Sequence, residues 1–517
     1  MGLAYNNVMS FKMTEARILA VNISTRFSAY LVNIAISFFL TPFIRAALGT
    51  ATYGFLGLGQ NFISYLDIFT FLTAGTIFRY VMIEHTQDNP DRVNHYMASS
   101  FYGTLIYVAL MVMPVIYFIV RLASFLVIDP VIVQDVQWLF GLLLVNFVLN
   151  TFFLIFRIGT QVVNKYYLIA LRDLAAVFVE VSILVFLYTT FEPKLYYLGI
   201  SMVVISALTL IYDYAMMRHF LPEIRLKWVY VKWTYLKQLM SSGFYHMIKQ
   251  LSTVLLVGLD LWFANVFVSD LAMGQLAIAK ILPKTMQSFL NLATGSFNVM
   301  FTRLYAQKRI QHLVTQIKRG IKVLGTVTML PNVILVVYGL PFFKLWIPGE
   351  NAVLIYQLSV LTALVLVVSG LTQPLHNIFM MTNRLKFNAM VHLIYGIVST
   401  LTVLIFLWTT DYGIYAIAGV STIYGLLLPF IFHIPYAADC LGVPRTTFYP
   451  VIAKSMGVFG LMVGVGFALS MGMMPSTWIG LIVACAVLGL VSVGILAFIY
   501  FTADERQMFF NIFKRHA

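Results

Sequence analysis

Long apolar stretches separated by short polar connections run through this sequence from end to end. A helix needs roughly 20 mostly apolar residues to cross a bilayer, and about fourteen stretches are long enough. They cover residues 15–46, 52–81, 95–121, 133–158, 165–190, 195–217, 238–267, 271–302, 317–344, 351–380, 386–409, 412–437, 449–472 and 477–501. The pattern predicts an all-α polytopic membrane protein.

Composition agrees with this class. Hydrophobic residues make up 61% of the chain and charged residues 10%, and the mean hydropathy of +0.90 lies outside the globular range. The first apolar run is too long for a cleaved signal peptide, so we expect it to be an uncleaved first span. The connections leave no room for an extramembrane catalytic domain.

The basic residues predict the orientation, because cytoplasmic connections carry an excess of Lys and Arg. One side of the predicted membrane holds two basic connections, around 218–237 and 303–322, and both termini join it. We therefore expect both termini in the cytoplasm. The net charge of +14 reflects this bias, and no nucleic-acid partner is expected.

A shift of 220 residues aligns "FLYTTFEPKLYYLGIS" (186–201) with "FLWTTDYGIYAIAGVS" (406–421). The same shift pairs Gly54 with Gly274 and Gly75 with Gly295. The alternative is coincidence among Leu- and Phe-rich helices. A true repeat predicts two pseudo-symmetric six-helix lobes, 1–220 and 221–440, related as parallel repeats, and two further helices with the C-terminus in 441–517.

The opening of the chain carries a family resemblance. "LTPFIRAALGTATYGFLGLGQ" (40–60) and "LTAGTIFRYV" (72–81) resemble the start of polysaccharide transporters in the multidrug/oligosaccharidyl-lipid/polysaccharide (MOP) exporter superfamily. "LAMGQLAIAKI" (271–281) is similar to the start of the eighth span in that family. The predicted plan of fourteen spans rather than twelve also resembles the lipid II flippase branch of the superfamily.

The resemblance implies a secondary transporter and not an enzyme. Its substrate would be a polyprenyl-(pyro)phosphate-linked oligosaccharide or teichoic-acid precursor, moved from the cytoplasmic to the outer leaflet of a bacterial cytoplasmic (inner) membrane. The implied partners are this lipid-linked glycan and membrane lipids, and a monomer is expected. A cation-coupled multidrug exporter of the same superfamily and a membrane glycan polymerase remain alternatives.

Basic residues inside the apolar stretches are the candidate substrate-binding groups. A Lys or Arg near the bilayer centre costs roughly 2.5–3.5 kcal/mol, so such residues normally face a polar cavity. Lys280 and Lys284 share a helical face, and Pro283 between them can kink their helix. Snorkelling to the interface is the alternative. The full set is Arg26, His246, Lys249, Lys280 and Lys284.

The repeat also suggests a substitution at one of these positions. Gln60 matches Lys280 under the 220-residue shift. A glutamine at position 280 is therefore expected to preserve the fold while removing a charge.

Three acidic residues also fall inside apolar stretches: Asp67, Glu180 and Asp260. They could couple transport to an ion, contact sugar hydroxyls, or form structural ion pairs with cavity cations. No cofactor is expected, and Na⁺ or H⁺ would be the coupling ion. No Cys or His cluster has metal-ligand spacing, and His376 and His433 are interpreted as packing residues. The sequence shows no phosphate-binding Gly loop, so ATP is not an expected ligand.

Two peripheral features fit a lipid substrate. Residues 218–239 interleave basic and aromatic side chains, which predicts a helix in the cytoplasmic membrane interface. Gly460 and Gly464 give the thirteenth stretch a smooth face. Close helix packing is the expected use of this face, and a lipid-tail groove is the alternative.

Overall fold

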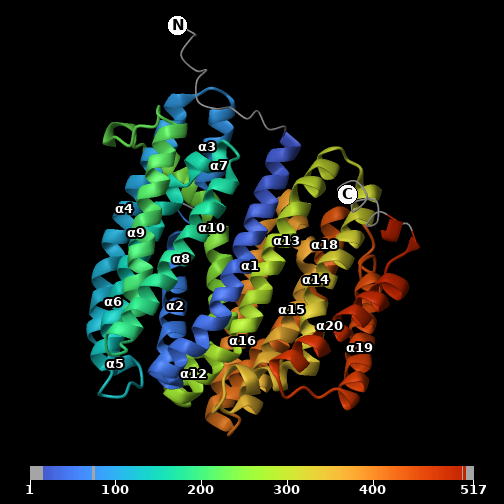
Figure 1. Ribbon diagram of the computed structural model, residues 1–517. Helices are drawn as coiled ribbons and strands as arrows, with labels where there is room; N and C mark the ends of the chain where they lie inside the picture. Colours follow the sequence, from blue (N-terminus) through green and yellow to red (C-terminus); the bar gives the residue numbers. More distant parts are fainter. Residues whose placement is uncertain (1–14, 71, 73–75, 383, 504, 508–517) are drawn as a thin grey trace. The chain divides into compact units, whose positions relative to one another are not determined.

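The computed structural model describes residues 15–70, 72, 76–382, 384–503 and 505–507. Within that part, the side chains of 15–21, 23, 26, 153, 295, 296, 298 and 299 are not described. Helices make up all the regular secondary structure of the described residues (Figure 1). The expected all-α class is confirmed.

The first half of the chain contains ten α-helices and one short 3-10 helix. Their bounds are α1 (Glu15–Leu48), α2 (Thr50–Thr70), α3 (Ile77–Thr86), α4 (Pro90–Val120), α5 (Leu122–Phe125), α6 (Val133–Phe156), α7 (Ile158–Val162), α8 (Tyr166–Thr190), α9 (Tyr196–Phe220), η1 (Trp228–Tyr230) and α10 (Trp233–Thr253).

In the second half, π-helical segments interrupt two helical stretches and form the end of a third. The bounds are η2 (Val254–Gly258), α11 (Asp260–Phe267), α12 (Asp270–Ala279), α13 (Ile281–Ala306), α14 (Ile310–Trp346), α15 (Ala352–Met381), α16 (Leu385–Thr409), α17 (Ile414–Leu428), η3 (Pro429–His433), α18 (Ile434–Leu441), α19 (Tyr449–Gly472), α20 (Trp478–Ile495) and η4 (Leu496–Tyr500).

Most of the long helices overlap the expected apolar ranges, although several extend beyond them: α4 begins at Pro90 instead of 95, and α14 covers Ile310–Trp346 instead of 317–344. Among the described residues, 11 helical segments are long and apolar enough to cross a membrane. The chain is therefore a multi-pass membrane protein, while the expected number of about fourteen crossings is not confirmed.

The chain divides into two compact units. The first comprises Met1–Gly49 and Phe62–Met247, and the second Thr50–Asn61 and Ile248–Ala517. In the first, α6 packs along α9, and α1 packs along α8. In the second, α14 packs against α13, α15, α19 and α20. The core there includes Phe301, Tyr338 and Phe379.

The start of α2 crosses α12 at glycines within the second unit. A Cβ atom on Gly54 would lie 2.7 Å from the Cα of Gly274, and one on Gly274 would lie 2.2 Å from the Thr50 carbonyl oxygen. A Cβ on Gly57 would lie 3.2 Å from the Ala277 Cβ. Each of these contacting pairs, 54 with 274 and 57 with 277, is separated by the repeat offset of 220.

This crossing gives a stability prediction. Gly274→Ala should lower the free energy of unfolding by about 1–3 kcal/mol, because the new methyl group overlaps backbone that cannot move aside. The midpoint of thermal unfolding of the purified protein measures the effect. Gly460→Ala is the matched control, because nothing among the described residues lies within 4 Å of a Cβ there. Equal stability of the two variants would contradict this packing.

The expectation of one interfacial helix over 218–239 is wrong, because no single helix covers that range. Among these residues α9 ends at Phe220, a three-residue 3-10 helix covers Trp228–Tyr230, and α10 begins at Trp233. Pro222 and the β-branched residues of this link disfavour a helix. Contacts to α4 hold the link in place, as the Arg225 amide donates to Asn94 Oδ1 at 2.6 Å.

Candidate functional site

The helical stretch that carries Lys280 and Lys284 is broken at Lys280. α12 ends at Ala279, Lys280 lies at the junction, and α13 begins at Ile281. Pro283 explains the break, because its ring lacks an N–H and clashes with the carbonyl four residues earlier, that of Ala279. The expected kink is confirmed. It places Lys280 at a helix junction, where its side chain can reach a neighbouring helix.

That neighbour contains a π-helical segment, η2. The backbone N–H of Leu259 donates to the carbonyl of Val254 at 3.2 Å, five residues back. Such a bulge leaves carbonyl groups without their usual α-helical donors, and π-bulges often occur at functional sites. Side chains supply the donors here: Thr400 to Leu255 at 2.6 Å, Asn61 to Gly258 at 3.0 Å and Lys280 to Val257 at 3.1 Å.

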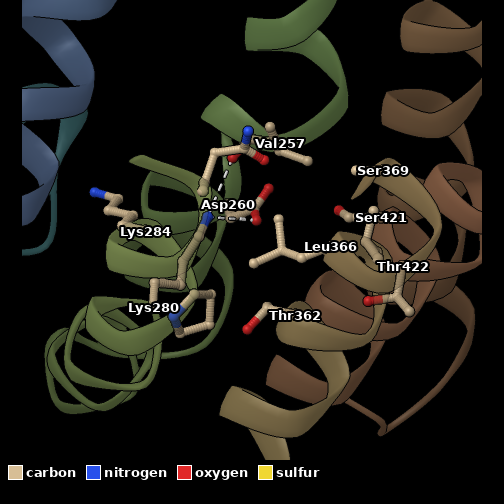
Figure 2. A pocket seen from close by; sticks show the side chains of 12 residues that line it. Val257, Asp260, Lys280, Lys284, Thr362, Leu366, Ser369, Ser421 and Thr422 are labelled. Carbon is tan, nitrogen blue, oxygen red and sulfur yellow. Dashed lines mark hydrogen bonds and ion pairs between the residues drawn. The ribbon is translucent and has the colours of Figure 1, made fainter. Parts of the chain in front are cut away.

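Lys280 also forms an ion pair with Asp260, the first residue of α11. The Nζ atom of Lys280 donates to Asp260 Oδ2 at 2.7 Å, and the two side chains are 12% and 6% exposed (Figure 2). The carboxylate additionally lies at a helix N-terminus, where the helix dipole favours negative charge. Asp260 therefore neutralises most of the charge that Lys280 brings into the protein.

The ion pair borders a cavity of about 290 Å³ within the second unit. Figure 2 shows Lys280 directed at Asp260 and Val257, while the exposed Lys284 extends away from them. Residues of η2, α11–α13, α15 and α17 line the cavity: Val257, Asp260, Lys280, Pro283, Lys284, Gln287, Thr362, Val365, Leu366, Ser369, Ser421 and Thr422. The structure thus brings Lys280, Lys284 and Asp260 together at one cavity.

Lys284 differs from Lys280 in its partners. Among the described residues, its ammonium group takes part in no hydrogen bond or ion pair. Asp260 is already engaged by Lys280, so the three charged groups sum to one net positive charge beside the cavity. The cavity can attract an anion, and Lys284 carries the charge for it.

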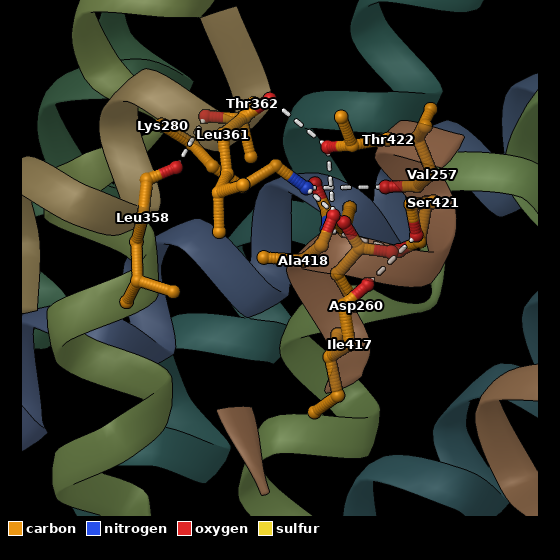
Figure 3. Close-up of polar contacts among 12 residues, drawn as sticks. Val257, Asp260, Lys280, Leu358, Leu361, Thr362, Ile417, Ala418, Ser421 and Thr422 are labelled. Atoms are coloured by element: carbon orange, nitrogen blue, oxygen red, sulfur yellow. Dashed lines mark hydrogen bonds and ion pairs between the residues drawn. The ribbon is translucent and has the colours of Figure 1, made fainter. Parts of the chain in front are cut away.

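The opposite wall offers hydroxyl groups from α15 and α17 (Figure 3). The Thr422 hydroxyl donates to the carbonyls of Leu361 at 2.9 Å and Ala418 at 2.8 Å. Ser421 donates to Ile417 at 3.0 Å. Because these hydrogens are directed at the backbone, each oxygen retains acceptor capacity. Sugar hydroxyl groups or ordered water can donate to such a wall.

Other predicted site residues lie elsewhere. Lys249 does not line this cavity; it is exposed on α10 and acts electrostatically on His376, His392 and His433. His246 lies three residues earlier on α10, in the part of that helix assigned to the first unit. The side chain of Arg26 lies outside the described residues, although its backbone belongs to α1.

Asp67 and Glu180 belong to the first unit, on α2 and α8, and both are partly buried. Among the described residues, neither carboxylate forms an ion pair with a basic side chain. A buried salt bridge does occupy α8, where Arg172 Nη1 lies 2.5 Å from Asp213 Oδ2 of α9. Asp67 and Glu180 remain candidates for ion coupling or sugar contact.

Sequence reasoning did not find the cluster of His376, His392 and His433. Their ligand nitrogens all lie within 4.8 Å of one another, although the residues come from α15, α16 and η3. No local spacing signals such a cluster, because metal motifs are recognised from ligands a few residues apart.

Several solved transporter structures have an architecture similar to that of this chain. An outward-facing multidrug transporter of the MATE family in the MOP superfamily superposes with a TM-score of 0.62 at 11% identity, covering 82% of this chain and 95% of that one. The lipid II flippase MurJ, in an inward closed conformation, gives 0.59 at 12% identity, with 93% and 98% covered.

A MOP superfamily transporter from Pyrococcus furiosus, described as having a binding pocket of reverse polarity, gives a TM-score of 0.59 at 13% identity, with 82% and 95% covered. The chain therefore has the fold of the MOP superfamily transporters, which confirms the resemblance at the level of the fold.

At the sequence level, no protein-family model matches the chain. A protein of Bacillus subtilis (strain 168) named "Uncharacterized membrane protein EpsK" is 22% identical over 503 residues, which cover 96% of this chain and 98% of that protein. The similarity extends over essentially the whole length of both chains.

Proposed function

We propose that this protein is a flippase that moves a polyprenyl-(pyro)phosphate-linked oligosaccharide or teichoic-acid precursor from the cytoplasmic to the outer leaflet by alternating access. It acts as a secondary transporter in a bacterial cytoplasmic membrane, with both termini in the cytoplasm. Na⁺ or H⁺ is the coupling ion.

The observation that carries this proposal is the unequal pairing of the two lysines. Lys280 is neutralised by Asp260, while Lys284 lies at the same cavity without a partner among the described residues. A phosphate of the substrate headgroup can pair with this ammonium group, because it supplies both the opposite charge and strong acceptor oxygens.

Two further features support a lipid-linked glycan. The hydroxyl-lined wall at Thr362, Ser421 and Thr422 suits a sugar. On α19, a Cβ at Gly460 or Gly464 would meet nothing within 4 Å among the described residues, so the expected close helix packing at this face is wrong. The open face supports the alternative, a groove for the lipid tail.

The multidrug-exporter alternative is less well supported at this cavity. A cationic drug needs an acidic group that is free to bind it. The carboxylate that lines the cavity, Asp260, is already bound to Lys280.

Depletion of the protein from its host tests the proposed function. The lipid-linked glycan should accumulate on the cytoplasmic leaflet of the membrane, which can be measured by its inaccessibility to an impermeant sugar-modifying enzyme in intact cells. Accumulation of short glycans on the outer leaflet would instead identify a polymerase.

A further inference from the structure

The histidine cluster has a geometry of its own, apart from the lysine cavity. The rings of His376 and His433 lie with centroids 4.6 Å apart, and those of His392 and His433 with centroids 4.7 Å apart. The Nε2 atoms of His392 and His433 are 2.7 Å apart, which is a hydrogen bond between two imidazoles. Three helical segments thus direct their imidazoles at one point.

Two buried polar atoms on the helical segments that carry these histidines lack a hydrogen-bond partner among the described residues. His433 is 3% exposed, and its Nδ1 atom has no hydrogen-bond partner among the described residues. Asn388 is 2% exposed, and its Oδ1 atom also lacks a partner within the described part of the chain. Asn388 lies one helical turn before His392, so the two share a face of α16. Buried polar groups without a partner are unfavourable, so a ligand that uses them would be stabilising.

We propose that His376, His392 and His433 bind one divalent first-row transition metal ion, with Zn²⁺ the expected occupant. Neutral imidazole is a preferred ligand of Zn²⁺, Cu²⁺, Ni²⁺ and Co²⁺, whereas Na⁺, Mg²⁺ and Ca²⁺ require oxygen ligands. Three histidines and an open fourth position form a common zinc site. A water molecule or an anion takes the fourth position.

Binding requires a small rearrangement. Zn–N bonds of about 2.0–2.1 Å in a tetrahedron place the ligand nitrogens about 3.4 Å apart. The separation of 2.7 Å between His392 and His433 must therefore increase by about 0.7 Å, so the metal replaces their hydrogen bond. The bound ion then links α15, α16 and η3, which should stabilise this part of the second unit.

Lys249 opposes the ion. Its ammonium group acts electrostatically on all three rings, and its positive charge repels a metal cation bound by them. Lys249→Gln should therefore increase the affinity for Zn²⁺. Adventitious binding to surface histidines would not respond to this substitution.

Purified, untagged full-length protein in detergent provides the test. Zn²⁺ binding is measured by titration calorimetry, and Co²⁺ is used as a spectroscopic probe whose visible absorption reports a tetrahedral nitrogen site. We expect one metal ion per chain and a rise in the midpoint of thermal unfolding with Zn²⁺. His392→Gln should weaken Zn²⁺ binding by at least about tenfold. Losing a residue that only positions a metal ligand already costs about that much affinity, and His392 would be a ligand itself.

His312→Gln is the matched control, because His312 is an exposed histidine on α14 outside the cluster. His376→Gln serves as a second ligand variant if His392→Gln does not fold. Equal Zn²⁺ affinity of the wild type and a folded ligand variant would overturn the proposal, as would the absence of the tetrahedral Co²⁺ spectrum. None of these readouts depends on transport, so the result is independent of the proposed flippase function.

Discussion

Lys280→Gln is expected to lower the free energy of unfolding by about 3–5 kcal/mol, because it leaves Asp260 charged, buried and unpaired. The carboxylate is 6% exposed and its ion-pair partner is Lys280. The substitution also removes the donor to the Val257 carbonyl in the π-helical segment. The midpoint of thermal unfolding and the amount of folded protein in the membrane measure the loss.

The double variant Asp260→Asn with Lys280→Gln separates the charge effect from loss of packing. It removes both charges and should recover most of the stability, because a buried ion pair contributes little net stability over a neutral pair. If Lys280→Gln alone is as stable as the wild type, the ion pair does not hold the helix junction. If the double variant is no more stable than the single variant, the loss does not come from the unpaired carboxylate.

Lys284→Gln should leave the protein folded but weaken the interaction with an anionic substrate about tenfold to a hundredfold, the value of one hydrogen bond to a charged group. The side chain is exposed and has no ion-pair partner among the described residues, so its removal leaves no buried charge behind. The measurement is the concentration dependence of transport at matched protein levels.

Lys344→Gln is the control for Lys284→Gln. Lys344 is also an exposed lysine in an apolar helix, but it does not line the cavity. Lys284→Arg keeps the charge and should retain part of the activity. Equal transport by Lys284→Gln and Lys344→Gln would show that Lys284 does not contact the substrate.

Much of the fold is predictable from the sequence, because bilayer thickness fixes the length of each apolar stretch. The break at Lys280 was also predictable, since Pro283 cannot continue the hydrogen-bond ladder. The π-helical segments were not, because one extra residue in a turn leaves no mark in an apolar stretch such as Val254–Gly258.

The charged residues of the site were predictable from the sequence, but the ion pair that two of them form was not. Sequence reasoning selected Lys280, Lys284 and Asp260, yet the partner of Lys280 lies 20 residues away on another helix. The repeat suggested that Gln, which occupies position 60, would be tolerated at position 280. The ion pair changes that expectation, because Gln cannot neutralise Asp260.

The histidine cluster was also not predictable from the sequence, because its three members lie on different helical segments. His376, His392 and His433 meet through the packing of α15 with η3 and of α16 with α17, the helix that leads into η3. The chain separations between these residues carry no periodic signal that links them. Tertiary packing, and not spacing along the chain, creates this cluster.

Transport of a purified lipid tests the central claim most directly. The protein is reconstituted into proteoliposomes with a fluorescent polyprenyl-pyrophosphate oligosaccharide, and its movement between leaflets is followed with an impermeant quencher. A polyprenyl glycoside with the same sugar but no phosphate serves as the neutral comparison. We predict that the wild type moves the pyrophosphate-linked lipid faster than the neutral one, and that Lys284→Gln removes this preference. Equal rates for the two lipids in the wild type would contradict recognition of an anionic headgroup at the lysine cavity.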